Sequence, residues 1–282
     1  MTKPNQLSQV RSLIMDMDGV VRRGHVPIPG ASEFLSFLRQ HGIAFLLLTN
    51  NSTLTSKQYA ASLQEIGIDT GEDSILTAGE ATAMYLAQAA VPGTEVYVVG
   101  EEGLRTELLK RGFVLHEGPD VAFVVVGLDR QFTYDKMTMA TRAILRGARF
   151  IGTNPDKGFP APDGLVPGAG AVLAGIEAAT GVAPLIIGKP QRAIFELALQ
   201  KLAADTATTA MLGDRLETDI HGGSQMGLLT ILVLSGVTDA EQLASSTIHP
   251  DLVYQDVAVL HQAWKGALTR QDAAPSGHAT HR

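Results

Sequence analysis

Short apolar runs alternate with helical patterns along most of this 282-residue chain, and this alternation limits the possible folds more than any other feature. Runs such as 43–48, 121–126 and 229–234 are almost wholly apolar, which is typical of strands buried on both faces. Segments such as 101–111 and 134–147 between the runs have a helical pattern. The sequence therefore predicts an α/β fold in which helices cover both faces of a parallel sheet.

Local signals place several element boundaries. Thr55 and Gln58 form a capping-box pattern that opens a helix, and Gly67 ends it. Gly42 suits the position just after the preceding helix, and Pro190 suits the first turn of a later one. A helix is also expected at about 168–180. The other expected strands are 13–15, 95–99, 149–152, 184–187, 209–212 and 252–254.

Composition excludes several classes of protein. Hydrophobic residues make up 45% of the chain, which is ample for a core, and the net charge of −7 disfavours nucleic acid as a partner. There is no Cys, so disulfides, thiol nucleophiles and Cys-ligated metals are excluded. We see no signal peptide, and no apolar run approaches the roughly 18 residues needed to cross a membrane. A protein of the reducing cytoplasm, without a membrane partner, is expected.

Two carboxylates, Asp16 and Asp18, stand where the apolar run 13–15 ends and Gly19 interrupts it. Ligands of open parallel sheets bind at the carboxyl ends of the strands. Two neighbouring carboxylates repel each other unless a cation is present, and Mg²⁺ prefers oxygen ligands. The pair thus indicates a Mg²⁺ site, although two loop acids that cap a turn would look the same.

Two further motifs also follow apolar runs. Thr49, with the N–H groups of Asn50 and Asn51, would form a cradle for an anion, or else a loop with capping duties only. Lys189 follows the run 184–187. A lone lysine is usually a solvated surface charge, but a strand end is a suitable place for a phosphate clamp.

A fourth motif follows the run 209–212. Asp214 and Asp219 could supply one metal ligand and one acceptor behind it, or Asp214 could cap a helix. Because all four motifs stand at the ends of predicted parallel strands, one fold would bring them to one edge. Together they match phosphoryl transfer to an aspartate.

In order and spacing the four motifs resemble those of the haloacid dehalogenase superfamily. The interval from Asp16 to Thr49 is too short for the caps that many members insert there, whereas the interval up to Lys189 holds an extra α/β segment. This placement resembles the C2 cap of subfamily IIA, the branch of 4-nitrophenylphosphatases, phosphoglycolate phosphatases and NagD-like proteins. The string 168-GAGAVLAGIEAATG-181 is similar to that branch as well.

The resemblance implies a Rossmann-like core domain formed by residues 1–91 and 184–282, with a smaller C2-type cap domain inserted at 92–183. Residues 269–282 are polar and are expected to be a disordered tail. Cap-mediated homodimerisation is also known in the branch and is an expectation here.

The resemblance also implies roles for the acidic residues. Asp16 would be the nucleophile that becomes an aspartyl phosphate, and Asp18 would be the general acid and base. Mg²⁺ would bind the Asp16 carboxylate, the Asp18 backbone carbonyl and the Asp214 carboxylate, with Asp219 outside the ligand shell. Because dehalogenases of the superfamily have no acid at the position of Asp18, its presence favours phosphate esters.

Phosphate binding would fall to Thr49, the turn of Asn50 and Asn51, and Lys189. Two cap residues lie in stretches that resemble loops touching the leaving group in the branch: Phe159 matches a position that helps select the substrate in relatives, and Leu128 matches an aromatic position in some of them. Ordinary loop packing explains both residues equally well. The expected function is Mg²⁺-dependent hydrolysis of small phosphomonoesters, that is, a phosphoric monoester hydrolase. Its partner would be a small phosphorylated metabolite such as phosphoglycolate, a sugar phosphate or a nucleoside monophosphate.

Rival functions fit less well. The string 168-GAGAVLAG-175 departs from the dinucleotide fingerprint at Leu173 and follows no expected strand, and GKP at 188–190 lacks the rest of a P-loop. A non-catalytic sensor of a phosphorylated metabolite is the alternative, since fold alone does not establish activity. Against the sensor, every catalytic position holds a competent residue.

Overall fold

The computed structural model describes residues 4–161 and 164–272. It divides into two compact units, one formed by residues 1–45 and 204–282 and the other by residues 46–203. The predicted domain boundaries at 91/92 and 183/184 stay a prediction. In the described ranges no helix is both long and apolar enough to cross a membrane.

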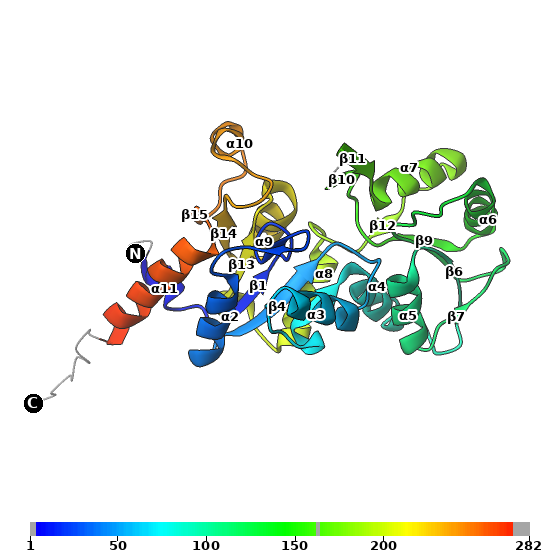
Figure 1. Cartoon of the computed structure of the whole chain (residues 1–282). Helices are drawn as coiled ribbons and strands as arrows, with labels where there is room; N and C mark the ends of the chain where they lie inside the picture. Colours follow the sequence, from blue (N-terminus) through cyan, green and yellow to red (C-terminus); the bar gives the residue numbers. More distant parts are fainter. Residues whose placement is uncertain (1–3, 162–163, 273–282) are drawn as a thin grey trace, which may run out of the picture. The chain divides into compact units, whose positions relative to one another are not determined.

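The first unit contains four parallel strands in the order β15-β14-β13-β1 (Figure 1). Their bounds are β1 (Ser12–Met15), β13 (Thr209–Gly213), β14 (Leu229–Val233) and β15 (Leu252–Tyr254). Every residue of β1 and β13 is buried, which accounts for their largely apolar sequences. Met15 pairs with Leu212 in parallel, so β1 and β13 both end at the same edge of the sheet.

Helices α2 (Ala31–Gln40) and α11 (Val257–Asp272) of this unit pack against each other. Ring contacts join Phe34 to Trp264 at 5.9 Å and Phe37 to His261 at 4.6 Å between centroids. The remaining elements are α1 (Pro4–Leu7), β2 (Arg22–Arg23), β3 (Val26–Pro27), a 3-10 turn (Thr206–Thr208), a π-helical turn (Leu216–Ile220), α9 (His221–Gln225) and α10 (Ala240–Ser245).

The predicted start of a disordered tail at residue 269 differs from the structure. Because α11 runs to Asp272, residues 269–272 are helical rather than disordered. Arg and Gln are good helix formers, and the Thr269 hydroxyl donates to the Lys265 carbonyl, so polarity alone did not end the helix. Residues 273–282 of the predicted tail lie outside the described residues.

Acidification should weaken the packing of α11 on α2. Burial lowers the pKa of His261 below its ordinary value, and the charge of Lys265 acts in the same direction. His261 therefore binds a proton more readily in the unfolded chain than in the folded one. As a result, the free energy of unfolding should fall as pH drops below about 6.5. Urea titrations of the wild type and of His261→Phe between about pH 7.5 and about pH 5 test this. Stability should fall less steeply in the variant, and equal slopes would contradict the prediction.

The second unit contains a five-stranded, all-parallel sheet in the order β12-β9-β8-β6-β7. Its strands are β6 (Glu95–Val99), β7 (Val114–Leu115), β8 (Phe123–Val126), β9 (Arg149–Gly152) and β12 (Leu185–Ile186). Helices α6 (Tyr134–Leu145) and α7 (Ala169–Thr180) pack against this sheet and bury an apolar core with it (Figure 1).

Apart from residues 44 and 45 of β4, which belong to the first unit, the same unit contains the parallel pair β4 (Ala44–Thr49) and β5 (Ile75–Thr77). Its other elements are α3 (Ser56–Glu65), a 3-10 turn (Glu72–Ser74), α4 (Ala78–Ala87), α5 (Glu102–Lys110), the hairpin of β10 (Gly158–Ala161) and β11 (Gly164–Pro167), and α8 (Arg192–Leu202). The predicted capping box of Thr55 and Gln58 is confirmed at the start of α3.

The expected strand at 184–187 is present as β12, which pairs with β9 of the same unit. The prediction that Pro190 lies in the first turn of a helix is wrong, since α8 begins at Arg192 with Gln191 as its N-cap. The Gln191 N–H donates to the Gly188 carbonyl at 3.0 Å, and this turn delays the helix.

Candidate active site

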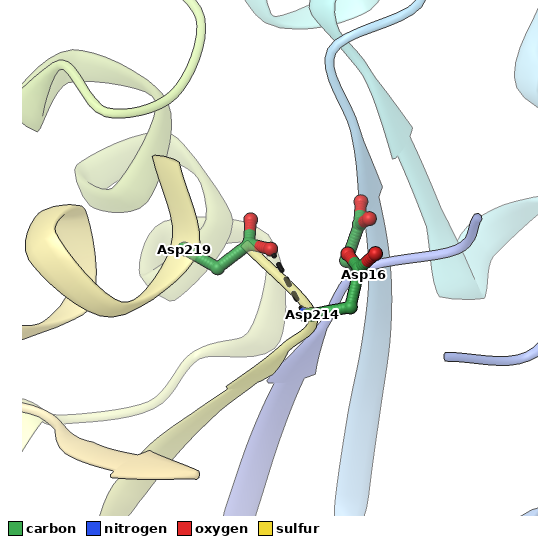
Figure 2. A group of neighbouring side chains, drawn as sticks. All are labelled: Asp16, Asp214 and Asp219. Carbon is green, nitrogen blue, oxygen red and sulfur yellow. Dashed lines mark hydrogen bonds between the residues drawn. The ribbon is translucent and has the colours of Figure 1, made fainter. Parts of the chain in front are cut away.

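Three buried aspartates of the first unit converge beside the carboxyl ends of β1 and β13 (Figure 2). Asp16 follows β1, Asp214 follows β13, and Asp219 lies in the π-helical turn after it. One carboxylate oxygen from each lies within 4.8 Å of the other two. Their exposed fractions are 8%, 1% and 0%. Carboxylates so close and so buried repel one another unless a cation neutralises them.

The Asp219 carboxylate accepts hydrogen bonds from the nearby backbone. Its Oδ2 accepts the N–H groups of Asp214 at 3.2 Å and Arg215 at 3.1 Å, as the dashed line in Figure 2 shows for Asp214. Oδ2 of Asp214 accepts the N–H of Val237 at 2.7 Å. Asp219 therefore orients the segment that carries Asp214, which fits an acceptor lying behind a metal ligand.

Two glycines provide the space in which the Asp214 carboxylate lies. A Cβ built at Gly236 would lie 1.8 Å from its Oδ2, and one built at Gly19 would lie 2.2 Å away. Gly19 also has a φ of +88°, which disfavours any side chain there. The backbone can therefore approach this carboxylate so closely only because positions 19 and 236 are glycines.

Changing Gly236→Ala should weaken Mg²⁺ binding by about tenfold or more, because the new methyl group must displace a carboxylate that lines the acidic cluster. Isothermal titration with MgCl₂ measures the effect. Gly71→Ala is the matched control, because a Cβ at Gly71 meets nothing within 4 Å. Equal Mg²⁺ affinity in the wild type and Gly236→Ala would show that this contact does not shape a metal site.

Asp18 lies in the tight turn after β1, and 52% of its side chain is exposed. The turn is closed by the Arg22 N–H, which donates to the Met17 carbonyl, and by the Gly19 N–H, which donates to the Arg22 carbonyl. Nε of Arg22 donates to Oδ1 of Asp18 at 3.2 Å. Asp18 thus differs from the three buried aspartates in facing solvent.

Thr49 ends β4 and begins the second group of predicted residues, which lies in the second unit. Its Oγ1 accepts the Asn51 N–H at 3.2 Å, and Oδ1 of Asn51 accepts the Thr53 N–H at 2.8 Å. The bond between the Asn51 N–H and the Thr49 hydroxyl shapes the turn, and the role of the Asn51 N–H toward an anion stays a prediction.

Lys189 and Asn50 are brought together across 139 residues of sequence. The Asn50 amide bonds twice to the Lys189 backbone, accepting its N–H at 2.8 Å and donating to its carbonyl at 3.0 Å. Lys189 is 2% exposed, and its Nζ donates to the Leu48 carbonyl at 3.1 Å. The buried ammonium is thereby held next to the end of β4.

Sequence reasoning missed two residues that support this contact. Asp156 accepts the Asn50 amide, with 3.2 Å between Asn50 Nδ2 and Asp156 Oδ2. The Asn154 amide donates to the Asn50 carbonyl at 2.7 Å. Both lie in the segment between β9 and β10, a few residues before Phe159. Their polar side chains directly after β9 were a usable signal.

The two predicted cap residues lie in separate segments of the second unit. Leu128 is partly buried in the loop after β8, next to Asp129, whose carboxylate bonds to Lys136 at 2.7 Å. Phe159 is partly buried in strand β10 and pairs with Val166 of β11. The roles of both residues toward a substrate stay predictions.

Comparisons with known proteins find relatives over most of this chain. A family model described as haloacid dehalogenase-like hydrolase matches residues 13–114, and a second HAD-hydrolase-like model matches residues 186–260. The chain is 39% identical over 251 residues to an acid sugar phosphatase of Staphylococcus aureus strain USA300, covering 89% of this chain and 96% of the relative.

Two solved structures show the same fold. A p-nitrophenyl phosphatase from Archaeoglobus fulgidus has a TM-score of 0.86 and 36% identity, with 90% of this chain and 99% of that chain covered. NagD from E. coli K-12 has a TM-score of 0.83 and 39% identity, with 88% and 97% covered.

Proposed function

This chain belongs to the haloacid dehalogenase-like hydrolases, and from that premise we propose that it is a Mg²⁺-dependent phosphatase of small phosphomonoesters. The buried cluster of Asp16, Asp214 and Asp219 carries the proposal, because it joins a potential nucleophile to oxygen ligands for a cation. The names of the acid sugar phosphatase and the p-nitrophenyl phosphatase support this class of reaction.

The donor set of the cluster fits Mg²⁺. The cluster is compact and anionic, and glycines leave room around Asp214. The Asp16 carboxylate, the Asp18 backbone carbonyl and the Asp214 carboxylate would hold the ion, and Asp219 would orient the Asp214 segment. When bound, Mg²⁺ supplies positive charge for the transferring phosphoryl group.

Asp16 and Asp18 divide the chemistry between them. A carboxylate oxygen of Asp16 forms a bond to phosphorus while the ester P–O bond breaks, and the departing oxygen takes the proton of the Asp18 carboxyl group. A water molecule then attacks the aspartyl phosphate and gives its proton to Asp18. The bond between Asp16 and phosphorus breaks, so one ester and one water yield one alcohol and one phosphate.

Thr49, Asn50, Asn51 and Lys189 would bind the phosphoryl oxygens. The support is that Lys189 is buried and held at its backbone by Asn50 and at its Nζ by the Leu48 carbonyl. A positioned ammonium is worth most where water is excluded, because the local dielectric is low. Leu128 and Phe159 would contact the leaving group.

The experiment is phosphate release from a panel of esters in Mg²⁺ and in EDTA. The panel contains 4-nitrophenyl phosphate, phosphoglycolate, hexose phosphates and nucleoside monophosphates. Release that requires Mg²⁺ is expected, with hexose phosphates among the best substrates, as the name of the Staphylococcus relative suggests. Binding of an ester without any release, by folded and Mg²⁺-loaded protein, would favour a sensor instead.

A homodimer formed through residues 92–183 and a cytoplasmic location remain part of the proposal. Size-exclusion chromatography with light scattering tests the first of these. A monomeric mass at concentrations used for the activity measurements would reject it.

A further inference from the structure

We propose that Arg22 is a positioning residue that holds the Asp18 carboxyl group in reach of the leaving-group oxygen, an inference that rests on the proposed function. Arg22 lies outside the four motifs found in the sequence. Its contact with Asp18 is made within the first unit, by the turn that follows β1.

Burial differs sharply between the two partners. The Asp18 side chain is 52% exposed, so its own packing restricts its rotamers little, whereas the Arg22 side chain is 10% exposed. The Arg22 Nε and Asp18 Oδ1 atoms are 3.2 Å apart. A restrained guanidinium therefore limits where an otherwise mobile carboxyl group can lie.

The backbone of the turn makes this contact possible. The Arg22 N–H donates to the Met17 carbonyl at 3.1 Å, and the Gly19 N–H donates to the Arg22 carbonyl at 2.7 Å. As a result, the backbones of Asp18 and Arg22 form an isolated β-bridge. The separation of the two side chains is thus set by short backbone hydrogen bonds rather than by flexible loops.

The next residue, Arg23, provides an internal comparison. It is exposed, and its guanidinium donates to the Ser235 carbonyl instead of to Asp18. The Ser235 hydroxyl donates to the Gly19 carbonyl at 2.7 Å, so Arg23 and Ser235 brace the same turn from outside. Arg22 is directed at the carboxylate, whereas Arg23 supports the backbone, and a substitution at each separates the two effects.

Position matters to Asp18 because proton transfer needs hydrogen-bond reach to the departing oxygen. As the ester P–O bond breaks, a basic leaving group depends on receiving the Asp18 proton. A 4-nitrophenolate ion departs readily without it. A displaced Asp18 should therefore slow esters of basic leaving groups selectively.

The test uses kcat/KM of the Mg²⁺-loaded enzyme for 4-nitrophenyl, phenyl and 4-methoxyphenyl phosphate, which share a ring and differ in leaving-group basicity. For Arg22→Met we expect a loss of about threefold or less with 4-nitrophenyl phosphate. With the other two esters the loss should be about tenfold or more, within the 10²–10⁴-fold that a general acid contributes. Arg22→Lys, which keeps a donor, should recover part of the loss.

Two controls exclude a merely structural role. Arg23→Met should show the same relative loss for all three esters, whatever its overall rate. The double variant Asp18→Asn with Arg22→Met should have the same kcat/KM as Asp18→Asn alone for each of the three esters, because the carboxyl group that Arg22 positions is already gone. Thermal unfolding of each variant confirms that it is folded.

An equal loss for all three esters in Arg22→Met, or a further loss in the double variant, would overturn the assignment of Arg22. A smaller loss for the basic leaving groups would overturn it as well. Failure of the wild-type enzyme to hydrolyse any of the esters would instead reject the proposed function, so the two failures are distinguishable.

Discussion

Replacing Asp16 with Asn should reduce phosphate release by about 10⁴-fold or more, the scale of loss seen when a nucleophile is removed. The amide has nearly the same shape as the carboxylate, but it cannot form the bond to phosphorus. The fold should survive, because one charge leaves a cluster of three buried carboxylates.

Steady-state turnover of 4-nitrophenyl phosphate measures the loss, and acid quenching with ³²P-labelled ester tests for the aspartyl phosphate. Asp205→Asn is the matched control, since Asp205 caps the turn at Thr206–Thr208 and Asn caps equally well. Label trapped on the wild type and absent from Asp16→Asn is expected. Turnover near the wild-type rate would remove Asp16 as the nucleophile.

Replacing Lys189 with Met should lower kcat/KM by about 10²–10³-fold, the cost of losing one aimed donor to a charged transition state. Met retains the length of the side chain in a site that is 2% exposed, so packing changes little. Inorganic phosphate, as a competitive inhibitor, should bind correspondingly less well, and this second measurement reports on binding rather than on chemistry.

Lys201 offers the control for that variant. Its Nζ also donates to a strand carbonyl, that of Ile75 at 2.7 Å, and pairs with Glu80 at 2.7 Å. Lys201→Met should lower the melting temperature but leave kcat/KM within about threefold of the wild type. Equal losses of kcat/KM in both variants would show that Lys189 contributes only to folding.

The longer elements of the fold could be predicted because their signals are local. Strands β6 and β9 were expected at the residues where they occur, and the capping box of α3 was readable from two side chains. The two-residue strand β7 was not predicted, and the partner of β12 was not foreseen. Such short strands owe their existence to the neighbours that pair with them, and those neighbours leave no mark on their sequence.

The candidate site divides in the same way. Each motif was visible because a polar residue that follows an apolar run is unusual and interpretable. The support given by Asn50 to the backbone of Lys189 was not visible, since it joins residues 139 positions apart. The bond between Arg22 and Asp18 spans only four residues, yet it depends on a turn that no sequence pattern specified.

The sequence by itself determined the class of fold, the positions of most of its buried strands along the chain and the identity of the polar residues that follow them. Hydrophobic periodicity and helix caps act over a few residues, so they can be read without a structure. Only the tertiary structure decided that Asp16, Asp214 and Asp219 share one buried cluster, and which glycines leave room for it. The distance between such side chains follows from strand register and backbone closure, which depend on the packing of the whole unit.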